Sequence, residues 1–303
     1  MTFIASAGVT NVDLLYVGMG RIPEEGEEIY AKEFRICLGG GAPGTAVTAA
    51  RLGIPVRLAT FLGNDLFSGF AHEELKRSHV ELSNLLPQGE TQIPVNVTSV
   101  MITERDRTFA SYGYDKKPDR EQMETLYQMS KGAKLAQMQL GFLPVYRRLK
   151  EEGTKLLLDF GLDEELSLEK YRDYIELADY YTPNQKEAMK ITGTASPQDA
   201  IEVLARYIAN PLVKLDKDGA LLLSGGSLIH VEAIPEFTYR DATGAGDAFL
   251  AGLMYGLFHD YGFQDAVLFG NITGGKCITE AGALTAWVGE EELLAIADRY
   301  RVG

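Results

Sequence analysis

The chain has 303 residues, of which 46% are apolar and 24% charged, so it can bury a large core as globular proteins do. Its 29 Lys and Arg stand against 43 Asp and Glu, and the net charge of −14 disfavours nucleic acid and anionic membranes as partners, because both require a basic surface. No apolar run has the length of a membrane span, the start lacks the basic region of a signal peptide, and the two cysteines lie far apart, so a cytoplasmic protein is expected.

The beginning of the chain predicts a first strand, which leads into the first half of a small sheet. Residues 12–37 and, later, residues 92–115 alternate apolar and polar positions between turns rich in Pro, Gly and charge, with no helix between their strands. This pattern predicts a small antiparallel β flap that projects from the main body. The flap is expected to close over a ligand as a lid, or to pair with a second copy in a homodimer.

Elsewhere, apolar runs of strand length alternate with helical segments. "VRLATFLG" follows "AVTAARLG", "KLLLDFG" follows "LPVYRRLKEEG", and "VKLDKDGALLLSGG" follows "SPQDAIEVLARYIAN". Strands separated by helices predict right-handed crossovers and a parallel sheet. The expected fold class is therefore α/β, with a doubly wound, mostly parallel central sheet and helices on both faces. We expect one domain over residues 1–303, with the flap as its lid.

The run "DATGAGDAF", residues 241–249, places a glycine turn directly before an apolar helical segment. The N–H groups at a helix start have no partner within the helix and lie at its positive end, and glycines let an anion approach them. Asp247 would then stand beside that anion, where it could take a proton from a hydroxyl during phosphoryl transfer. An Asp in a first helical turn is equally a helix cap, so the residues alone leave both interpretations open.

This run resembles the C-terminal signature of the ribokinase-like carbohydrate kinases, the PfkB family. Residues 11–53 resemble the family's substrate region, "LGNDLFSG" its Gly-Asp-Asp segment, "TPNQKEAMKITG" its Asn-x-x-Glu segment and "DKDGALLL" its nucleotide-side turn, all in the family's order. The resemblance extends over nearly the whole chain. It implies a ribokinase-like fold and a kinase that uses ATP and Mg²⁺ to phosphorylate a hydroxyl of a sugar or sugar-like molecule.

The resemblance also implies roles for residues around the glycine turn. Asp247 is the implied catalytic base. The implied anion hole consists of the backbone of Gly244, Ala245, Gly246 and Asp247. Asn184 and Glu187 match the Asn-x-x-Glu segment, which is associated with Mg²⁺ and phosphate through water. An Asn followed three residues later by Glu is also a capping box, and both roles can hold at once.

Further residues are implied on the nucleotide side. They are Asp216, Gly219, Asn271 and Gly274. Asp216 stands where the family usually has Gly, so the chain departs from the family's pattern at this position. Asp241 and Thr243 fall where family members often have a monovalent-cation loop, so the resemblance adds K⁺ as a candidate cation. Each of these positions is also compatible with an ordinary polar turn.

The substrate side is where the chain departs from the family. The implied substrate residues are Asp13, Gly40, Gly41, Gly44, Thr45, Arg107 and Tyr112. A carboxylate can accept from two hydroxyls, so Asp13 suits a sugar. Gly44 replaces the family's Asn, and residues 159–163 lack the Asn and Arg of the family's D-x-N-x-R. Phosphoryl transfer is therefore better supported than any named sugar, and Arg107 and Tyr112 would also suit a dimer contact.

Two alternatives remain open. "GGGAPG", Gly39 to Gly44, satisfies the G-x-G-x-x-G pattern with Asp65 about 20 residues further on, as in an NAD-dependent dehydrogenase. The glycines follow the flap rather than the first strand of a βαβ unit, which argues against it. Loss of the substrate-side amide favours a second alternative, a sensor of sugar or nucleotide on a kinase scaffold without catalysis.

Overall fold

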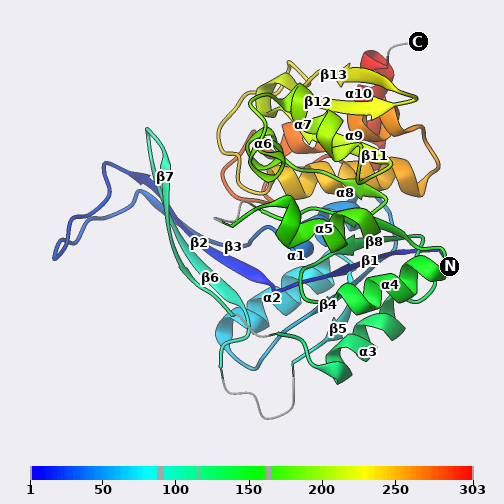
Figure 1. The fold of residues 1–303 in the computed structure, drawn as a ribbon. Coiled ribbons are helices and arrows are strands. Elements are labelled where there is room, and N and C mark those ends of the chain that lie inside the picture. Colours follow the sequence, from blue (N-terminus) through cyan, green and yellow to red (C-terminus); the bar gives the residue numbers. More distant parts are fainter. Residues whose placement is uncertain (1, 87–91, 115–116, 162–164, 302–303) are drawn as a thin grey trace.

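The body of the molecule is built on one large sheet (Figure 1). The computed structural model describes residues 2–86, 92–114, 117–161 and 165–301. The nine strands follow the order β13-β12-β11-β10-β9-β8-β1-β4-β5, and all pairs from β11 to β5 are parallel. The strands are β1 (Ile4–Ala7), β4 (Val56–Thr60), β5 (Glu81–Asn84), β8 (Leu135–Met138), β9 (Lys155–Leu158), β10 (Tyr180–Tyr181), β11 (Asn210–Lys214), β12 (Ala220–Ser224) and β13 (Ser227–Val231).

The sheet is covered by helices on both faces. One apolar cluster packs α1 (Ala42–Arg51), α2 (Leu66–Arg77), α8 (Ala245–Phe258), α9 (Phe263–Cys277) and α10 (Glu290–Tyr300) against the sheet. A second cluster packs α3 (Arg120–Ser130), α4 (Leu143–Glu151), α5 (Leu168–Leu177), α6 (Gln185–Thr192) and α7 (Pro197–Leu204) on the other side. Central strands such as β9 are apolar on both faces, as a doubly covered parallel sheet requires. The predicted fold class is confirmed.

Local sequence signals explain where many of these helices begin. Five helices start behind a side chain that accepts a hydrogen bond from a free N–H of the first turn, and these caps are Asp65, Asp119, Ser167, Asn184 and Ser196. Helix α8 has no such side-chain cap, because Gly244 precedes it. The N–H groups at the N-terminus of α8 are therefore not covered by a capping side chain.

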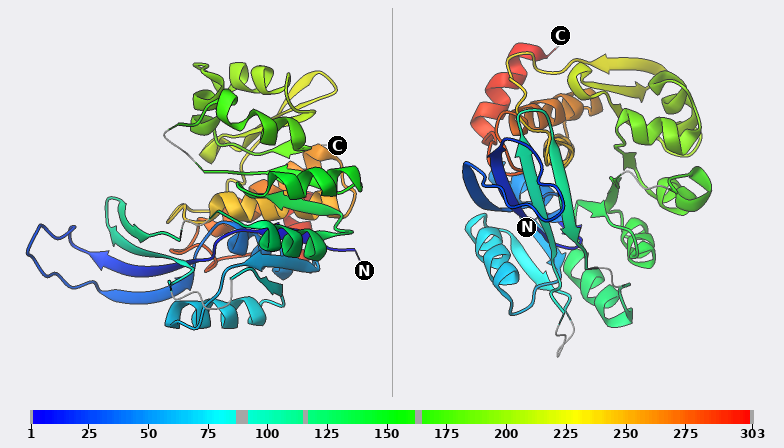
Figure 2. Two further views of the ribbon diagram at one scale, coloured as in Figure 1. Left: turned by 60° about the horizontal axis from the view of Figure 1, so that its bottom comes forward. Right: turned by 90° about the vertical axis from the view of Figure 1, so that its left-hand side faces the viewer.

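A second, four-stranded sheet projects from the body as the flap (Figures 1 and 2). Its strands are β2 (Asn11–Met19), β3 (Glu33–Leu38), β6 (Asn96–Thr103) and β7 (Arg107–Tyr112), in the order β3-β2-β6-β7. The pairs β2–β3 and β6–β7 are antiparallel, as predicted. The central pair β2–β6 is parallel, because both strands leave the body at the same side and run outward. Residue 115, the end of the predicted flap, lies outside the described residues.

The edge of the large sheet also differs from the parallel pattern. The segment after α7 forms three strands, β11, β12 and β13, that pair in antiparallel fashion. The turn between β11 and β12 is a short 3-10 helix, η1 (Asp216–Asp218).

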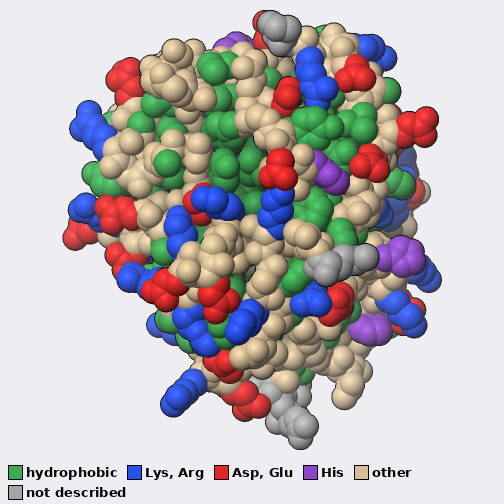
Figure 3. Space-filling view, turned by 90° about the vertical axis from the view of Figure 1, so that its right-hand side faces the viewer, with side chains coloured by type: hydrophobic (Ala, Val, Ile, Leu, Met, Phe, Trp, Pro, Cys, Tyr) green, Lys and Arg blue, Asp and Glu red, His purple; other side chains and the backbone are tan. Residues whose placement is uncertain are grey.

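On the face away from the flap, Lys and Arg side chains alternate with Asp and Glu rather than gathering by sign (Figure 3). Within the described ranges, no helix has the length and apolar character needed to cross a membrane.

Candidate active site

A cavity of about 370 Å³ lies at the carboxyl edge of the large sheet. The chain runs outward from β1 through β4 to β5, then returns to the other side of β1 with β8, so the sheet has its topological switch point between β1 and β8. Gly8 follows β1 and Gln139 follows β8, and both line this cavity. Ligands of doubly wound proteins bind at such a point, which makes this cavity the candidate substrate site.

Asp247 lies next to this cavity, in the first turn of α8. Its Oδ2 accepts a hydrogen bond from the N–H of Gly41, at 2.8 Å, and Gly41 lines the cavity. Burial raises the pKa of Asp247 to about 7, while the bond from Gly41 opposes this rise and the nearby charge of Asp159 adds to it. A carboxyl group that titrates near neutral pH can both accept and release a proton, which is what a general base needs.

The start of α8 provides free backbone donors beside Asp247. Gly244 has φ 78°, a left-handed conformation that favours glycine, and an added Cβ would lie 2.5 Å from the Cβ of Ala283. As the second and third residues of the helix, Gly246 and Asp247 have N–H groups without a partner in the helix. The N–H of Ala245 donates instead to the carbonyl of Ala242, at 3.2 Å. Of the predicted anion-hole residues, Gly246 and Asp247 therefore offer free N–H groups, whereas the N–H of Ala245 is already bonded.

Two carboxylates lie close to the backbone of residues 39–41, the glycine loop that precedes α1. A Cβ on Gly40 would lie 2.3 Å from Oδ2 of Asp247, and one on Gly39 would lie 2.9 Å from both oxygens of Asp13. Gly44, in the first turn of α1, also lies against Asp247, since its Cβ would be 3.6 Å from that of Asp247. The loop therefore needs glycines because Asp13 and Asp247 approach its backbone.

Substitution of Gly40 by Ala is expected to displace the carboxylate of Asp247 and to lower kcat/KM by about 10²-fold, as misplacement of a reacting group by about 1 Å does. Stability should change little, because the group that must move is the end of a side chain. Gly69→Ala is the matched control: this helical glycine has open space around it, so the variant should keep its activity. Steady-state kinetics and thermal denaturation decide, and full activity of Gly40→Ala would contradict the proposed contact.

A chain of side-chain amides ties the glycine loop to the flap. Asn11 on β2 donates to the carbonyl of Gly40 at 3.0 Å, and Asn96 on β6 donates to Oδ1 of Asn11 at 2.8 Å. Asp13, two residues along β2, is buried, and burial together with the charge of Asp241 raises its pKa to about 6. The structure thus brings Asp13, Gly40, Gly41 and Gly44 together with Asp247.

Three other predicted substrate residues lie elsewhere. Thr45 is fully buried, and its hydroxyl accepts from Gln137 at 3.4 Å. The hydroxyl of Tyr112 donates to the carbonyl of Ile93, at 3.2 Å, and does not line the cavity. Arg107 contacts the loop before α8, where its guanidinium bonds the carboxylate of Asp241. Their roles at a substrate remain predictions, and the geometry gives them no support.

Lys214 and Asp159 form an ion pair that the sequence did not single out as functional. Lys214 is the last residue of β11 and Asp159 directly follows β9, two parallel strands with β10 between them, and the Lys214 Nζ lies 3.3 Å from Oδ2 of Asp159. The same ammonium lies 3.4 Å from the position that a Cβ on Gly246 would take. Burial raises the pKa of Asp159, and Lys214 opposes that rise. A cation therefore lies at the α8 N-terminus.

Asn184 and Glu187 form the capping box that their spacing predicts. Oδ1 of Asn184 accepts from the N–H of Glu187 at 3.0 Å, and Oε2 of Glu187 accepts from the N–H of Asn184 at 2.8 Å. Burial raises the pKa of Glu187, partly offset by its bond to Asn184 and by the charge of Lys214. The charges of the Lys214–Asp159 ion pair, at the ends of β11 and β9, therefore act on the carboxyl group of Glu187.

Two of the predicted nucleotide-side residues, Gly219 and Asn271, meet at the end of β13. The amide of Asn271 donates to the carbonyls of Val231 and Glu232, both at 2.9 Å, and a Cβ on Gly219 would lie 2.2 Å from that same Val231 oxygen. Asp216 has φ 55°, a left-handed conformation that Asp tolerates and that explains the family's Gly there. Gly274 lies instead against α8, where an added Cβ would be 3.1 Å from the carbonyl oxygen of Ala245.

The dinucleotide interpretation is wrong. The glycines from Gly39 to Gly44 follow β3, a flap strand whose partner β2 is antiparallel, and not a strand of the parallel sheet. The carboxylate expected to bind ribose, Asp65, caps α2 by accepting from the N–H groups of Phe67 and Ser68 at 2.9 and 3.0 Å. Neither feature of a dinucleotide site is present here.

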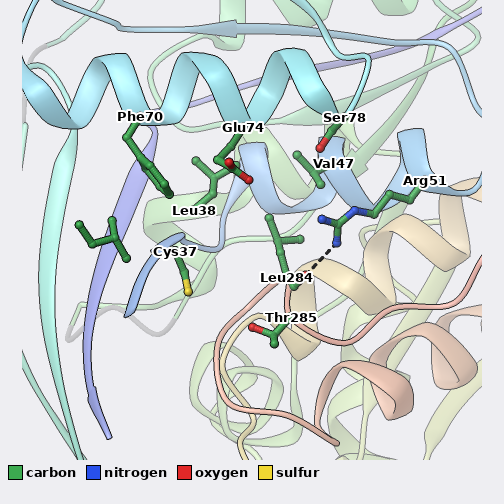
Figure 4. Close-up of a pocket in the computed structure, with 10 residues that line it drawn as sticks. Cys37, Leu38, Val47, Arg51, Phe70, Glu74, Ser78, Leu284 and Thr285 are labelled. Carbon is green, nitrogen blue, oxygen red and sulfur yellow. Dashed lines mark hydrogen bonds between the residues drawn. The ribbon is translucent and has the colours of Figure 1, made fainter. Parts of the chain in front are cut away.

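A smaller cavity, of about 170 Å³, lies behind the glycine loop between β3, α1, α2 and residues 284–285 (Figure 4). Arg51 lines it and donates to the carbonyl of Leu284 at 2.8 Å. Cys37 and Glu74 also line this cavity. None of the predicted site residues does, so this hollow is distinct from the candidate active site.

The fold and this arrangement together define a class of protein. A carboxylate at a helix N-terminus, at the switch point of a parallel sheet and with a lysine close by, suits phosphoryl transfer, in which a protein mainly positions reactants and stabilises charge. The sequence model of the pfkB family carbohydrate kinases matches residues 1–288. The chain belongs to this family and is a carbohydrate kinase.

Individual relatives agree with this assignment. The chain is 24% identical over 289 residues to a ribokinase of Lactococcus lactis, covering 93% of each protein. Its structure is similar to that of Arabidopsis thaliana ribokinase complexed with ribose and ATP, with a TM-score of 0.81 and 22% identity over 98% of this chain and 99% of that one. It is equally similar to an Escherichia coli protein in complex with ATP and Mg²⁺, with a TM-score of 0.82 and 19% identity over 99% and 100% of the two chains. These structures share the fold.

Proposed function

We propose that the protein transfers the γ-phosphoryl group of ATP to a hydroxyl of a neutral sugar-like molecule. The observation that supports this most strongly is the position of Asp247, which lies at the α8 N-terminus and bonds a residue that lines the cavity. The Arabidopsis relative that shares the fold was solved with ribose and ATP. In this proposal the acceptor occupies the cavity and ATP approaches the N-terminus of α8.

The reaction then uses groups of this chain for distinct tasks. The acceptor hydroxyl loses its proton to Asp247 as its oxygen forms a bond to the γ-phosphorus, and the bond from that phosphorus to the leaving ADP oxygen breaks. The N–H groups of Gly246 and Asp247 stabilise the charge on the transferred phosphoryl. The ammonium of Lys214, beside Gly246, adds a positive charge at the same place. Positioning and charge stabilisation account for most of the catalysis.

Mg²⁺ fits the residues at the neighbouring strand ends. Among the described residues, no group of three or more His, Cys, Asp and Glu side chains could hold a metal, which suits an ion bound mainly through water and phosphate oxygens. Asn184 and Glu187 would hold it through water, while they also cap α6. When bound, the ion would neutralise charge on the phosphate oxygens. The E. coli protein of the same fold was solved with ATP and Mg²⁺.

The lining of the cavity supports a neutral acceptor. Asn11, Asn96 and Gln139 contribute side-chain amides, and Phe61 and Phe142 contribute aromatic rings. No Asp, Glu, Lys or Arg occurs among the described residues that line it. Amides can donate to and accept from hydroxyls, whereas a sugar acid would lack a cation to pair with. Ketoses, aldoses and nucleosides are therefore better candidates than sugar acids.

The test is the release of ADP from ATP and Mg²⁺ across a panel of ketoses, aldoses, sugar acids, sugar amines and nucleosides. The proposal expects turnover on a neutral compound and none on its acid counterpart. Thermal stabilisation by ATP without turnover on any compound would instead favour a sensor without catalysis.

The free thiols of Cys37 and Cys277 support a reducing compartment, and we propose the cytoplasm.

The two faces of the flap support its two expected uses. Asp13 and Arg107 lie on one face, and the register places Phe34, Ile36 and Tyr112 on the other, where they are 53%, 41% and 40% exposed. We propose that the first face covers the active site as a lid and that the second pairs with another copy in a homodimer. Sedimentation should show a dimer that Phe34→Asp converts to monomer, whereas a monomeric wild type would contradict the pairing.

A further inference from the structure

The guanidinium of Arg107 joins the flap to the loop that precedes α8. Arg107 is the first residue of β7, at the outer end of the flap. Its Nη1 bonds the carboxylate of Asp241 and donates to the hydroxyl of Thr243 at 3.0 Å. The side chain of Asp241 is only 6% exposed, and that of Arg107 is 27% exposed. This contact therefore lies under the flap, shielded from most of the solvent, where an ion pair is screened less than at the surface.

Donors already surround the carboxylate of Asp241. Its Oδ1 accepts from the N–H and the hydroxyl of Thr243, at 3.0 and 2.8 Å, in addition to Arg107. Its Oδ2 accepts from the N–H of Gly282 at 2.9 Å. A potassium ion would require lone pairs of these same oxygens. The residues expected to hold K⁺ therefore do not fit a free cation in this arrangement, because a positive group of the chain is already present.

The hydrogen bonds and charges around Asp241 favour its ionised form. Burial alone would raise the pKa of Asp241, but the bonds from Gly282 and Thr243, together with the charge of Arg107, hold it below its usual value. The negative charge of Asp241 in turn contributes to the raised pKa of Asp13. Arg107 thus offsets the charge of a buried carboxylate that lies close to a second one.

We propose that Arg107 takes the place of a monovalent cation at the Asp241 loop, so that closure of the flap, and not K⁺, fixes the residues that lead into α8. This inference rests on the proposed kinase function, because the loop leads through Gly244 into the N-terminus of α8, where the N–H groups of Gly246 and Asp247 form the proposed anion hole. The loop is also held from the other side, where the thiol of Cys277 donates to the carbonyl of Thr243 at 3.4 Å. Arg107 is therefore a positioning residue for this loop.

Thermal denaturation without substrate tests the ion site separately from activity. The wild type should have the same melting temperature in potassium chloride and in choline chloride at equal ionic strength. Arg107→Ala, which leaves space beside Asp241, should gain stability specifically from potassium, whereas Arg107→Lys should not. Arg105→Ala is the control, since Arg105 is an exposed residue of the same turn. A potassium-specific rise in the wild type would overturn the proposal.

Turnover gives the second readout. Activity of the wild type should not depend on potassium, while potassium should raise the activity of Arg107→Ala by about 5-fold or more, the lower end of typical coupling between sites. Equal effects of Arg107→Ala and Arg105→Ala, or a potassium requirement in the wild type, would overturn the inference. A wild type that turns over but depends on potassium would contradict the inference about Arg107 and leave the proposed kinase function intact. Failure of the inference can therefore be distinguished from failure of the proposed function. If no acceptor supports turnover, the melting temperatures alone decide.

Discussion

Asp247→Asn is expected to lower kcat/KM by about 10²- to 10⁴-fold, the usual contribution of a general base. The amide keeps the shape of the side chain, and its oxygen can still accept from the N–H of Gly41, so substrate binding should persist. The wild type should show kcat/KM rising with pH through about 7, the pKa of Asp247, because only the ionised carboxylate can take the proton. Steady-state kinetics of both proteins between pH 5 and pH 9 would measure this.

The same variant should be at least as stable as the wild type. The folded-state pKa of Asp247 is about 7, above its ordinary value of 3.8, so the folded protein retains a proton that the unfolded chain has released. Stability from this group is complete below about pH 4 and is lost as pH rises through 7. The advantage of Asp247→Asn in melting temperature should therefore grow across this window. An inactive variant that has lost its fold would not support the assignment.

Lys214→Met is expected to lower kcat by about 10²- to 10³-fold, as removal of one group that stabilises transition-state charge does. The ammonium lies at the α8 N-terminus, and it also lowers the pKa of Asp247. The pH at which kcat/KM rises should consequently move upward in this variant. Kinetics at several pH values would show both effects, and Lys76→Met, at an exposed position of α2, is the surface control.

Loss of Lys214 also leaves Asp159 buried without its partner, which lowers stability. The double variant Lys214→Met, Asp159→Asn removes both charges, so it should recover stability, since the cost of an unpaired buried charge is gone. The pH at which kcat/KM of the double variant rises should return toward the wild-type value, because Asp159 and Lys214 shift the pKa of Asp247 in opposite directions. Its kcat should stay low. Recovery of kcat in the double variant would show that Lys214 acts only through the fold.

Local patterns in the sequence predicted much of the fold. Alternation of apolar strands and helical segments predicted the parallel sheet, because doubly buried strands and amphipathic helices have different periods. The glycine turn before residue 245 and the spacing of Asn184 and Glu187 predicted two helix starts. The parallel pairing of β2 with β6 did not follow from these patterns, since the two strands are far apart in sequence and the body determines their direction.

The site was predicted less completely for the same reason. The position of Asp247 at a helix start beside an anion was expected from the motif, whereas its contact with Gly41 and the pairing of Lys214 with Asp159 depend on how distant segments come together. Oppositely charged residues at the ends of two predicted parallel strands were the available signal. The contact between Arg107 and Asp241 joins the flap to the body over 134 positions of sequence, and no local period encodes it. Long-range electrostatic partners therefore needed the structure.

The most direct test of the account is the rate of phosphoryl transfer from ATP to neutral sugars and nucleosides by the wild type and by Asp247→Asn. We expect a phosphorylated neutral acceptor and stoichiometric ADP with the wild type, and a loss of about 10²-fold or more in the variant. A variant that keeps most of the activity would show that Asp247 is not the base, and a folded wild type that phosphorylates no acceptor would contradict the proposed reaction.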